Sequence, residues 1–383
     1  MDRANSFSKK IGIVGGGQLG KMMAQAAKQM GFFVTVLDPT PDSPAGQVAD
    51  RQITGDFLDP IKLDELVAQS DIVTFEIERV DEILILRESE GKLIYPSPKI
   101  LDLIQNKLAQ KAMLVKNRIP TAKYKKVEDD LETELKKFGY PAVQKASRGG
   151  YDGRGVFVLK NKNDVKNAIQ GESFLEELVK IKKELAVNVA RSANGEIKCH
   201  PVVEMTFDAR ANICDSVIAP ARVSEKVRKA AQNLAIKTVK ALGKGAVGIF
   251  GIEMFLTADG RVLVNEIAPR PHNSGHYTIE ACATSQFEQH IRAISGFPLG
   301  STAQLMPAVM VNLLGEVDAA GETALEGAFE ALAIPGLSLH LYGKKTVKPF
   351  RKMGHFTVTD KNIKGALKKA QKAKKLLKVR GKK

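Results

Sequence analysis

The residues best suited to bind ligands or take part in a reaction lie in one run of twelve, residues 265–276. This run reads Asn-Glu-Ile-Ala-Pro-Arg-Pro-His-Asn-Ser-Gly-His. A core strand would not carry so many polar side chains, and a solvated loop would not need two prolines to restrict its backbone. The run combines a carboxylate, a guanidinium, imidazoles and amide groups. It therefore predicts a site that holds a metal ion at one end and an anionic substrate at the other.

A hairpin is expected to bring two glutamates together. The Asp259-Gly260 dipeptide is typical of a two-residue turn, and the register that it sets places Glu253 opposite Glu266, with Cβ atoms about 4.5–5.5 Å apart. Like charges so close need a cation between them, and Mg²⁺ that also binds phosphates is the usual one. Apolar neighbours on both strands argue against the alternative, two solvated glutamates at a sheet edge. This register turns Asn265 to the other face unless a bulge intervenes.

The first glycine-rich loop, residues 15–20, has the pattern G-x-G-x-x-G between an expected strand at 11–14 and a helix. In that setting backbone N–H groups and the helix dipole can receive a phosphate. Asp38 ends the next strand, near the place where NAD enzymes keep a ribose-binding acid. The motif alone leaves three interpretations open: an NAD site, a phosphate of another ligand, or a structural turn. Gln18 could reach a substrate directly.

The second glycine-rich loop, residues 149–155, lies between two expected strands and so differs from a Walker loop. A hairpin of this kind can lie over the phosphates of a nucleotide with its amides pointing inward. Lys145 on the entering strand and Lys107 on the preceding helix are cations that could reach those phosphates. A plain surface hairpin and an ordinary surface lysine are the alternatives.

Further cations could bind anions. Arg270 could grip a carboxylate or a phosphate with two hydrogen bonds, or it could form an internal ion pair. His272 could instead be a hydrogen-bonded structural imidazole. Lys344, Arg351 and Lys352 form another cationic group, for which a solvated basic face is the alternative.

Alternating strand and helix patterns in the first part of the chain predict βαβ units and a parallel sheet. This part closes at the proline-rich run 95–98, and a single helix is expected to follow at about 98–117. Mixed strands and helices continue to about residue 295, and the last part is small and mixed. We therefore expect a fold of the α/β and α+β classes with domains at 1–97, 98–295 and 296–383.

The chain has 383 residues and a net charge of +15, most of which comes from the tail at 361–383 with its eleven Lys and Arg and no acids. Apolar residues recur in that tail at helical spacing, which favours a terminal helix with one packed stripe; contact with RNA or a membrane and disorder are the alternatives. Three widely spaced cysteines indicate a reducing compartment. With no apparent signal or membrane segment, we expect a cytoplasmic protein without nucleic-acid or membrane partners.

Taken in order, these motifs resemble the ATP-grasp superfamily and, within it, the 5-(carboxyamino)imidazole ribonucleotide synthases of purine biosynthesis. The matching stretches are 15–20, 75–78, 145–155, 218–222, 250–253, 265–276, 285–290, 342–344 and 351–355. The resemblance implies a Rossmann-like N-terminal domain, a central ATP-grasp domain and a small C-terminal domain, commonly in a homodimer. It also implies ATP-driven carboxylation of 5-aminoimidazole ribonucleotide with bicarbonate through carboxyphosphate, which yields ADP and phosphate.

The resemblance also implies a role for each matching residue. ATP would be bound by Lys107, Lys145, Gly150, Tyr151, Asp152, Gly153, Arg154, Gly155, Glu176, Glu177, Leu178, Val179, Glu184, Asn265 and Glu266, with Glu176 to Val179 reading the adenine and Glu184 binding the ribose. Glu253 and Glu266 would ligate Mg²⁺, and Arg270, His272 and Lys352 would act on bicarbonate. The ribonucleotide would contact Gln18, Leu19, Glu76, Tyr151, Asp152, Asn273, Ser274, Lys344 and Arg351.

Some features depart from the family pattern. Residues 203–208 lack a histidine that many members carry there, residues 347–350 differ from the usual Arg-Pro-Gly, and the lysine-rich tail lies outside the pattern. Three other functions remain open at this stage. They are another ATP-grasp ligase, such as formate-dependent glycinamide ribonucleotide transformylase or a biotin carboxylase, an RNA-binding protein that uses the tail, and a dehydrogenase.

Overall fold

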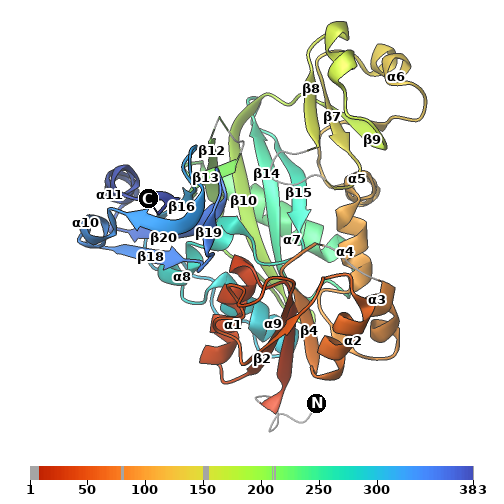
Figure 1. Cartoon of the computed structure of the whole chain (residues 1–383). Helices are drawn as coiled ribbons and strands as arrows, with labels where there is room; N and C mark the ends of the chain where they lie inside the picture. The colour runs from red at the N-terminus through yellow and green to blue at the C-terminus, as the bar shows by residue number, and fades with distance from the viewer. Residues whose placement is uncertain (1–7, 79–81, 150–154, 209, 211–212, 383) are drawn as a thin grey trace.

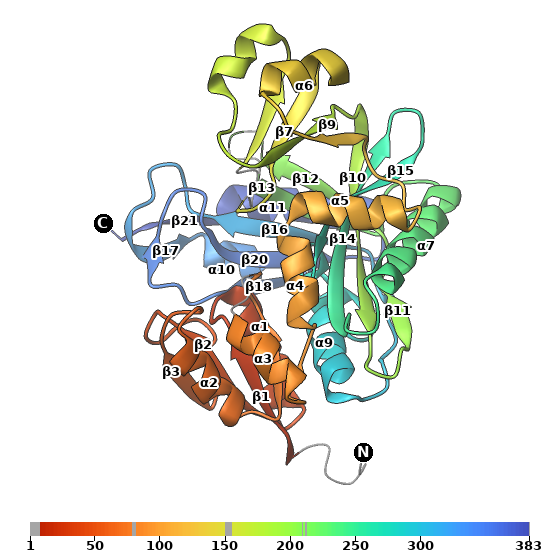
Figure 2. The same ribbon diagram turned by 90° about the vertical axis from the view of Figure 1, so that its right-hand side faces the viewer.

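The structure is a computed structural model that describes the chain except residues 1–7, 79–81, 150–154, 209, 211–212 and 383. Figures 1 and 2 show an N-terminal lobe in red and orange, a small yellow lobe at the opposite end, and a blue C-terminal lobe beside a long central sheet. Helices α4 and α5 lead from the N-terminal lobe toward the small lobe (Figure 1).

The N-terminal lobe contains the parallel sheet that the sequence predicts. Its strands lie in the order β3-β2-β1-β4-β5, and helices α1, α2 and α3 flank it. Their bounds are β1 Lys10–Val14, α1 Gln18–Gln29, β2 Phe33–Asp38, β3 Arg51–Thr54, α2 Pro60–Ala68, β4 Ile72–Phe75, α3 Glu82–Ser89 and β5 Leu93–Ile94. The chain order reverses beside β1, and the carboxyl ends of strands at such a point form a crevice in sheets of this type. The first glycine loop follows β1 at that crevice.

The small lobe is an antiparallel sheet in the order β6-β9-β7-β8, packed on helix α6. Its elements are β6 Tyr124–Lys126, α6 Leu131–Phe138, β7 Ala142–Ala146, β8 Val156–Leu159, η2 Lys162–Asn167 and β9 Ser173–Glu177. Leu135, Leu159 and Leu175 belong to a separate hydrophobic core in this lobe. This separate core gives the lobe its own support above the central sheet.

The central sheet runs through the order β15-β14-β10-β12-β13-β16-β20-β18 and therefore crosses the predicted boundary at residue 296. Its strands are β10 Ile181–Arg191, β11 Ile197–Cys199, β12 Val203–Asp208, β13 Ile213–Ala219, β14 Gly248–Thr257, β15 Val262–Ala268, β16 Ala308–Leu314, β18 Leu337–Leu341 and β20 Lys352–Thr359. The helices α7 Glu225–Ala241, α8 Thr278–Ala281 and α9 Gln286–Ser295 accompany it, together with the short turn η3 Asn273–Gly275. Central and C-terminal parts are thus joined by continuous strand pairing.

The prediction of one helix over residues 98–117 is wrong. Two helices occupy this range, α4 Pro98–Gln105 and α5 Lys107–Lys116. Asn106 between them is extended, and its side chain accepts a hydrogen bond from Ala109 N at 3.0 Å. An asparagine cap of this kind starts a new helix. The break makes Lys107 the first residue of α5.

The basic tail packs on the fold as a helix. Helix α11 Ile363–Leu376 buries Ala366, Ala370 and Ala373 in the C-terminal core, and strand β21 Lys378–Gly381 pairs with β17 Gly321–Glu326. The lobe is completed by α10 Ala328–Leu332 and β19 Thr346–Val347. The packed-stripe interpretation is confirmed. In the described parts of the chain, the helices lack the length and apolarity that crossing a membrane requires.

Candidate active site

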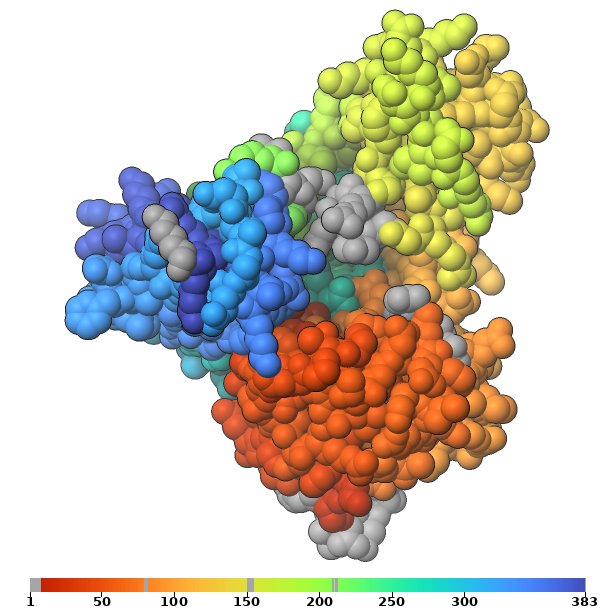
Figure 3. All heavy atoms as spheres, viewed as in Figure 1, coloured from red at the N-terminus to blue at the C-terminus, as the bar shows by residue number. Residues whose placement is uncertain are grey.

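The three lobes surround a hollow, which the space-filling view shows between the red N-terminal lobe, the blue C-terminal lobe and the yellow small lobe (Figure 3). The carboxyl end of β15 and the run that follows it reach this region from the central sheet. The predicted site residues that the structure describes come from all three lobes.

The predicted pairing of Glu253 with Glu266 is confirmed, but the predicted turn is wrong. Thr257 N donates to Arg261 O at 2.9 Å, so three residues, not two, form the loop. This longer loop shifts the strand register by one residue from the predicted one. A bulge at Asn265 then shifts it back, since Met254 pairs with Val264 but the next residue, Glu253, pairs with Glu266. The two irregularities compensate, and the bulge lets the Asn265 Oδ1 accept from the Lys145 Nζ at 3.2 Å.

Each acid of this hairpin has a cationic or imidazole partner. The Lys107 Nζ lies 3.0 Å from Glu266 Oε1, and the His272 Nε2 lies 3.1 Å from Glu253 Oε1. Burial opposes ionisation of Glu253, but the hydrogen bond from His272 and the nearby charge of Lys352 hold its pKa below the ordinary value. Glu253 is therefore ionised, and Lys352 lies near enough to influence it.

Glu176 lies near the end of strand β9, with its carboxylate buried between two lysines. Its Oε2 lies 2.5 Å from the Lys145 Nζ, and Lys111 forms an ion pair with its Oε1. Sequence reasoning missed Lys111, although its spacing of four from Lys107 was a signal that both lysines share one helix face. Residues 178–180 then connect the small sheet to the central sheet. The predicted adenine-reading segment 176–179 thus comprises the last two residues of β9 and the first two of this connection.

Glu184 lies on β10, on the face of the sheet that carries Glu253, since Ala186 pairs with Glu253 and Glu184 with Phe255. Burial, and then the charge of Glu253, raise the pKa of Glu184 to about 7, against the opposing charge of Lys145. Glu184 thus adds a third acid beside the hairpin pair.

The first glycine loop is held by carboxylates of its own lobe. Glu76 accepts hydrogen bonds from the backbone N of Gly17 and, at 3.2 Å, of Leu19, and Asp38 accepts from Gly16 N at 2.8 Å. Asp38 therefore serves the loop, which removes the main support for the NAD interpretation. A Cβ at Gly17 would lie 2.3 Å from Glu76 Oε1, so this close approach requires glycine.

Glu76 joins the glycine loop to the other lobes. Burial raises its pKa, while hydrogen bonds from Gly17 and Leu19 and the charges of Arg270 and Lys344 oppose that rise. Arg270 also forms an ion pair with Glu78 at 2.7 Å, as the alternative for this residue anticipated. Its Nε is nevertheless buried and, within the described part of the chain, lacks a hydrogen-bond partner. The arrangement leaves a donor on Arg270 for an anion.

The backbone around His272 is held by Gln286, a residue without a role in the sequence prediction. The Gln286 side chain accepts from His272 N at 2.9 Å and donates to His272 O at 2.8 Å. The His272 Nδ1 lies 2.9 Å from Ser274 Oγ, and Asn273 exchanges two side-chain hydrogen bonds with Asn312. Residues 272–274 are therefore placed by contacts with several elements. The signal was present in the matching stretch 285–290.

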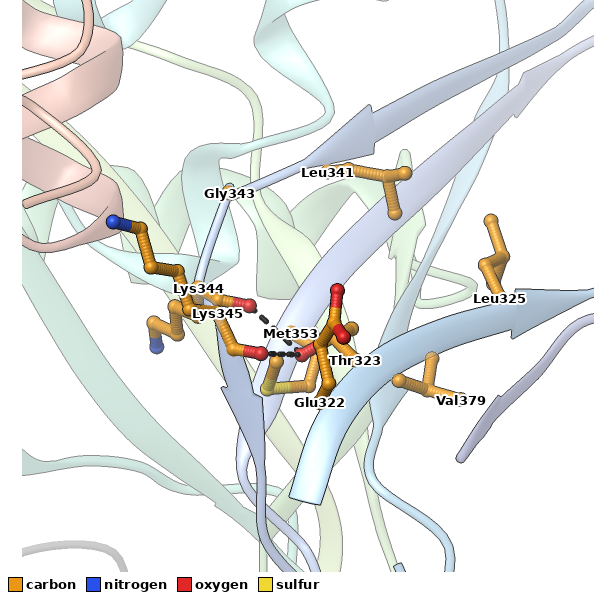
Figure 4. Close-up of a pocket in the computed structure, with 9 residues that line it drawn as sticks. All are labelled: Glu322, Thr323, Leu325, Leu341, Gly343, Lys344, Lys345, Met353 and Val379. Carbon is orange, nitrogen blue, oxygen red and sulfur yellow. Dashed lines mark hydrogen bonds between the residues drawn. The ribbon is translucent and has the colours of Figure 1, made fainter. Parts of the chain in front are cut away.

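The C-terminal cations lie beside the N-terminal lobe. The Lys344 Nζ donates to Lys352 O at 2.8 Å, and Arg351 donates to Thr346 O at 2.8 Å. A pocket of about 500 Å³ lies next to them. Figure 4 shows the ammonium groups of Lys344 and Lys345 pointing away from Leu325 and the other apolar residues that line it. Lys344 lines this pocket and also belongs to the cationic group, so the pocket borders the candidate site.

The predicted residues Gly150, Tyr151, Asp152, Gly153 and Arg154 lie outside the described residues. Gly155, where the described chain resumes, accepts from Ala146 N at 2.9 Å through its backbone oxygen. Lys145 pairs with Val156 on the neighbouring strand. The second glycine loop thus starts and ends on adjacent strands of the small lobe, as the sequence predicts.

Comparison with known proteins matches three family models in succession. Residues 8–105 match the ribonucleotide synthetase preATP-grasp domain, residues 112–287 the ATP-grasp domain, and residues 308–369 the phosphoribosylaminoimidazole carboxylase C-terminal domain. N5-carboxyaminoimidazole ribonucleotide synthase of Bacillus subtilis is 44% identical over 91% of this chain and 90% of that protein. This chain belongs to the N5-carboxyaminoimidazole ribonucleotide synthase family.

Solved structures agree with this membership of the synthase family. The N5-carboxyaminoimidazole ribonucleotide synthetase of Thermotoga maritima has a TM-score of 0.91 at 59% identity and covers 98% of this chain and 100% of its own. The Aspergillus clavatus synthase, solved with ADP and 5-aminoimidazole ribonucleotide, has a TM-score of 0.87 at 37% identity, with 97% and 99% covered. Phosphoribosylaminoimidazole carboxylase of Saccharomyces cerevisiae is longer: it is 41% identical over 92% of this chain but only 63% of that protein.

The predicted fold, function and enzyme class are confirmed by these comparisons. The three-part architecture matches the preATP-grasp, ATP-grasp and C-terminal models, and the chain is an ATP-grasp carbon–nitrogen ligase of purine biosynthesis. The rival transformylase, RNA-binding and dehydrogenase interpretations are not needed. The roles of individual residues remain predictions.

Proposed function

We propose that ATP, bicarbonate and 5-aminoimidazole ribonucleotide meet in the hollow between the lobes. There ATP phosphorylates bicarbonate to carboxyphosphate and leaves as ADP. The exocyclic amine then takes the carboxyl group, as the bond to phosphate breaks and phosphate and a proton are released. The observation that carries this proposal is the compensated hairpin, which places Glu253 and Glu266 side by side while His272 contacts Glu253. An acid pair for a metal–nucleotide complex and an imidazole for a one-carbon anion thus adjoin each other.

The residues present fit Mg²⁺ bound together with ATP. Among the residues that the structure describes, no group of three or more His, Cys, Asp or Glu is arranged to hold a metal ion, but Mg²⁺ in nucleotide sites uses one or two carboxylates together with substrate phosphates. Glu253 and Glu266 would supply those carboxylates, with Asn265 beside them. When bound, Mg²⁺ would neutralise charge on the phosphates.

We assign the ATP-binding role to the cations and to the link between the lobes. Lys107 and Lys145 now contact Glu266, Glu176 and Asn265, and both would turn to the phosphates when ATP enters. The segment 176–179 would hold the adenine and Glu184 the ribose. Residues 150–155 would cover the phosphates and so keep water from the reactive intermediate.

Bicarbonate would be held by Arg270, His272 and Lys352. The free Nε of Arg270 can donate to an anion, and a guanidinium binds planar oxyanions well. His272 donates from its Nε2 to Glu253, while its Nδ1 accepts from Ser274 N at 3.3 Å. These two contacts orient the ring toward the acid pair. Fixed donors of this kind stabilise charge that develops in the transition state.

The ribonucleotide would lie against the N- and C-terminal lobes. We assign it to Gln18, Leu19, Glu76, Tyr151, Asp152, Asn273, Ser274, Lys344 and Arg351. Within this set, Lys344 and Arg351 are the cations suited to its phosphate. Glu76 and the side chains near the glycine loop are suited to its hydroxyl groups.

Two substitutions test the assignment. Glu266→Ala should abolish ATP turnover while the fold remains intact, and His272→Leu should retain ATP binding but suppress carboxylation. ADP release and carboxylated product are measured with bicarbonate, with and without 5-aminoimidazole ribonucleotide. Turnover with glycinamide ribonucleotide and formate instead would contradict the proposal, as would near-normal activity of Glu266→Ala.

We also propose domain limits at 1–97, 98–295 and 296–383, a homodimer, and work in the cytoplasm without nucleic-acid or membrane partners. The packed tail supports the absence of a separate RNA-binding arm, because Lys369 and Lys374 pair with Asp360 and Asp215. Sedimentation velocity tests the homodimer, and limited proteolysis tests the domain limits. RNA binding that falls when residues 361–383 are removed would contradict the expected partners.

A further inference from the structure

Lys111 is a buried lysine one turn beyond Lys107 on α5. Its side chain is 3% exposed, and its ammonium forms an ion pair with Glu176, whose side chain is also 3% exposed. It donates to Thr121 Oγ1 at 2.6 Å, and Thr121 in turn donates to Val264 O at 2.7 Å. Lys111 thus links the small lobe to the strand that carries the metal-binding hairpin.

Glu176 lies between two cations that differ in their surroundings. Its Oε2 contacts Lys145, which also reaches Asn265 at the hairpin bulge. Its Oε1 contacts Lys111, which is enclosed by the fold. Burial lowers the pKa of Lys111, and the charge of Glu176 opposes that change. The order of charges is therefore Lys111, Glu176, Lys145, with Lys145 nearest the hairpin bulge at Asn265.

The proposed function would remove one of the two cationic partners of Glu176. If Lys145 turns to the phosphates of ATP, it must leave a carboxylate that is 2% exposed. A buried charge without a partner is strongly destabilising. Without a second cationic partner, Glu176 would then be an isolated buried anion whenever ATP is bound.

We propose that Lys111 is the resident counter-ion of Glu176, which allows Lys145 to move between Glu176 and the phosphates of ATP. This inference rests on the proposed ATP-binding role of Lys145. Lys111 is a positioning residue: it contacts Glu176 and Thr121, and it stays in place when ATP enters. The two lysines that share Glu176 also repel each other, and this repulsion favours the departure of Lys145. Lys107, one turn earlier, would instead contact the nucleotide directly.

The test is a double-mutant cycle on nucleotide binding. Affinity for a non-hydrolysable ATP analogue with Mg²⁺ is measured by calorimetry for Lys111→Met, Glu176→Gln and the double variant. Lys111→Met should weaken binding roughly 30-fold or more, because it leaves Lys145 as the sole counter-ion of Glu176. In the presence of Glu176→Gln, the same change should alter affinity by less than about threefold, because there is no charge left to compensate.

Matched variants separate this role from a general loss of stability. Arg222→Met removes one of the two cations on Glu204, which pairs with Arg222 and Lys183, and it should leave nucleotide affinity within about twofold. Lys111→Arg keeps the charge and should retain most of the affinity. If Lys111→Met does not fold, the double variant and Lys111→Arg still test the proposal, since loss of affinity in both would contradict it.

The outcomes distinguish failure of the counter-ion role from failure of the proposed function. Failure of the unaltered protein to bind the ATP analogue would overturn the proposed function. Normal binding by the unaltered protein and equally tight binding by Lys111→Met would overturn the counter-ion role alone. The counter-ion role would also be overturned if Lys111→Met lowered nucleotide affinity equally with Glu176 present and with Glu176→Gln, because the effect would then be independent of the Glu176 charge.

Discussion

Two buried glutamines on helix α9 make the same pair of hydrogen bonds to two different loops. Gln286 accepts from His272 N at 2.9 Å and donates to His272 O at 2.8 Å. Gln289 accepts from Gly300 N at 2.9 Å and donates to Gly300 O at 2.7 Å. Both side chains are fully buried. One amide holds a loop of the candidate active site, and the other holds a loop that follows α9.

The difference lies in what each glutamine holds. A side-chain amide satisfies both polar groups of one residue, so it fixes that backbone in a way an apolar residue cannot. At residue 300 the result is a stable connection to the C-terminal lobe. At residue 272 the same bonds place an imidazole beside Glu253. Gln286 also lies 3.2 Å from the Nδ1 of His276, so its amide supports two histidines.

The largest expected effect comes from Gln286→Leu. Loss of both bonds frees the backbone of His272, and a misplacement of about 1 Å can lower a rate roughly 100-fold. We expect carboxylated product to fall by about that factor, while ADP release falls much less, so that more ADP is formed for each product. The ratio of ADP to product, measured at saturating bicarbonate, checks this.

Gln289→Leu is the matched control for that variant. It too leaves one backbone N–H and one carbonyl oxygen buried without partners, at a cost of about 1–3 kcal/mol for each group. Both variants should therefore unfold at lower urea concentration. The Gln289 variant should keep its ratio of ADP to product near that of the unaltered protein; an equal rise in both variants would remove the special role of Gln286.

A smaller effect is expected from the glycines that adjoin the two amides. A Cβ at Gly275 would lie 2.3 Å from Gln286 Oε1, and a Cβ at Gly300 would lie 2.2 Å from Thr284 Oγ1. Gly275→Ala should displace the Gln286 amide and lower carboxylation about tenfold, since partial loss of alignment costs less than full release. Gly300→Ala should lower the melting temperature without that loss of activity.

Steady-state rates with 5-aminoimidazole ribonucleotide, together with thermal unfolding, separate the two alanine variants. If Gly300→Ala uncoupled ATP turnover from carboxylation as strongly as Gly275→Ala, the proposed difference between the two loops would be contradicted. If adding Gln286→Leu to Gly275→Ala caused no further loss of product formation, the result would support a role of Gly275 that acts through the Gln286 amide. Residues that act through one contact show such non-additivity.

Much of this architecture could be predicted because it depends on local patterns. The glycine loop after β1, the helix of the tail and the pairing of Glu253 with Glu266 follow from short-range spacing. The pairing was nevertheless predicted from a two-residue turn that is not present. The extra residue in the loop and the bulge at Asn265 cancel, which no local pattern could reveal.

The contacts that the sequence left hidden join residues far apart in the chain. Gln286 and His272 are 14 residues apart, and Lys111 on helix α5 meets Glu176 on strand β9. Neither partner carries a local signal of the other, since an isolated glutamine or lysine is usually exposed. The break between the helices at Asn106 had a local signal in the sequence, because asparagine is a strong helix cap. Its position within an otherwise helical stretch concealed it.

The smallest expected effect concerns His290, a third polar residue on α9, which joins the central sheet to the N-terminal lobe. Its Nδ1 accepts from Ile249 N at 3.1 Å, so its Nε2 carries the proton and donates to Thr74 Oγ1 at 2.7 Å. Burial lowers the pKa of His290 to about 3. The folded protein thus keeps this ring neutral where the unfolded chain, with a pKa of about 6.5, takes up a proton.

The sign of the pH dependence follows from that depressed pKa. The contribution of His290 to stability is complete above about pH 6.5 and is lost as pH falls toward 3, by up to about 1.4 kcal/mol for each pH unit. His290→Gln should flatten the fall in unfolding free energy between pH 7 and pH 5, as measured by urea titration, while carboxylation at pH 7 stays close to normal. Parallel curves for the two proteins would show that other groups dominate, and a large loss of activity would make His290 part of the same support as Gln286.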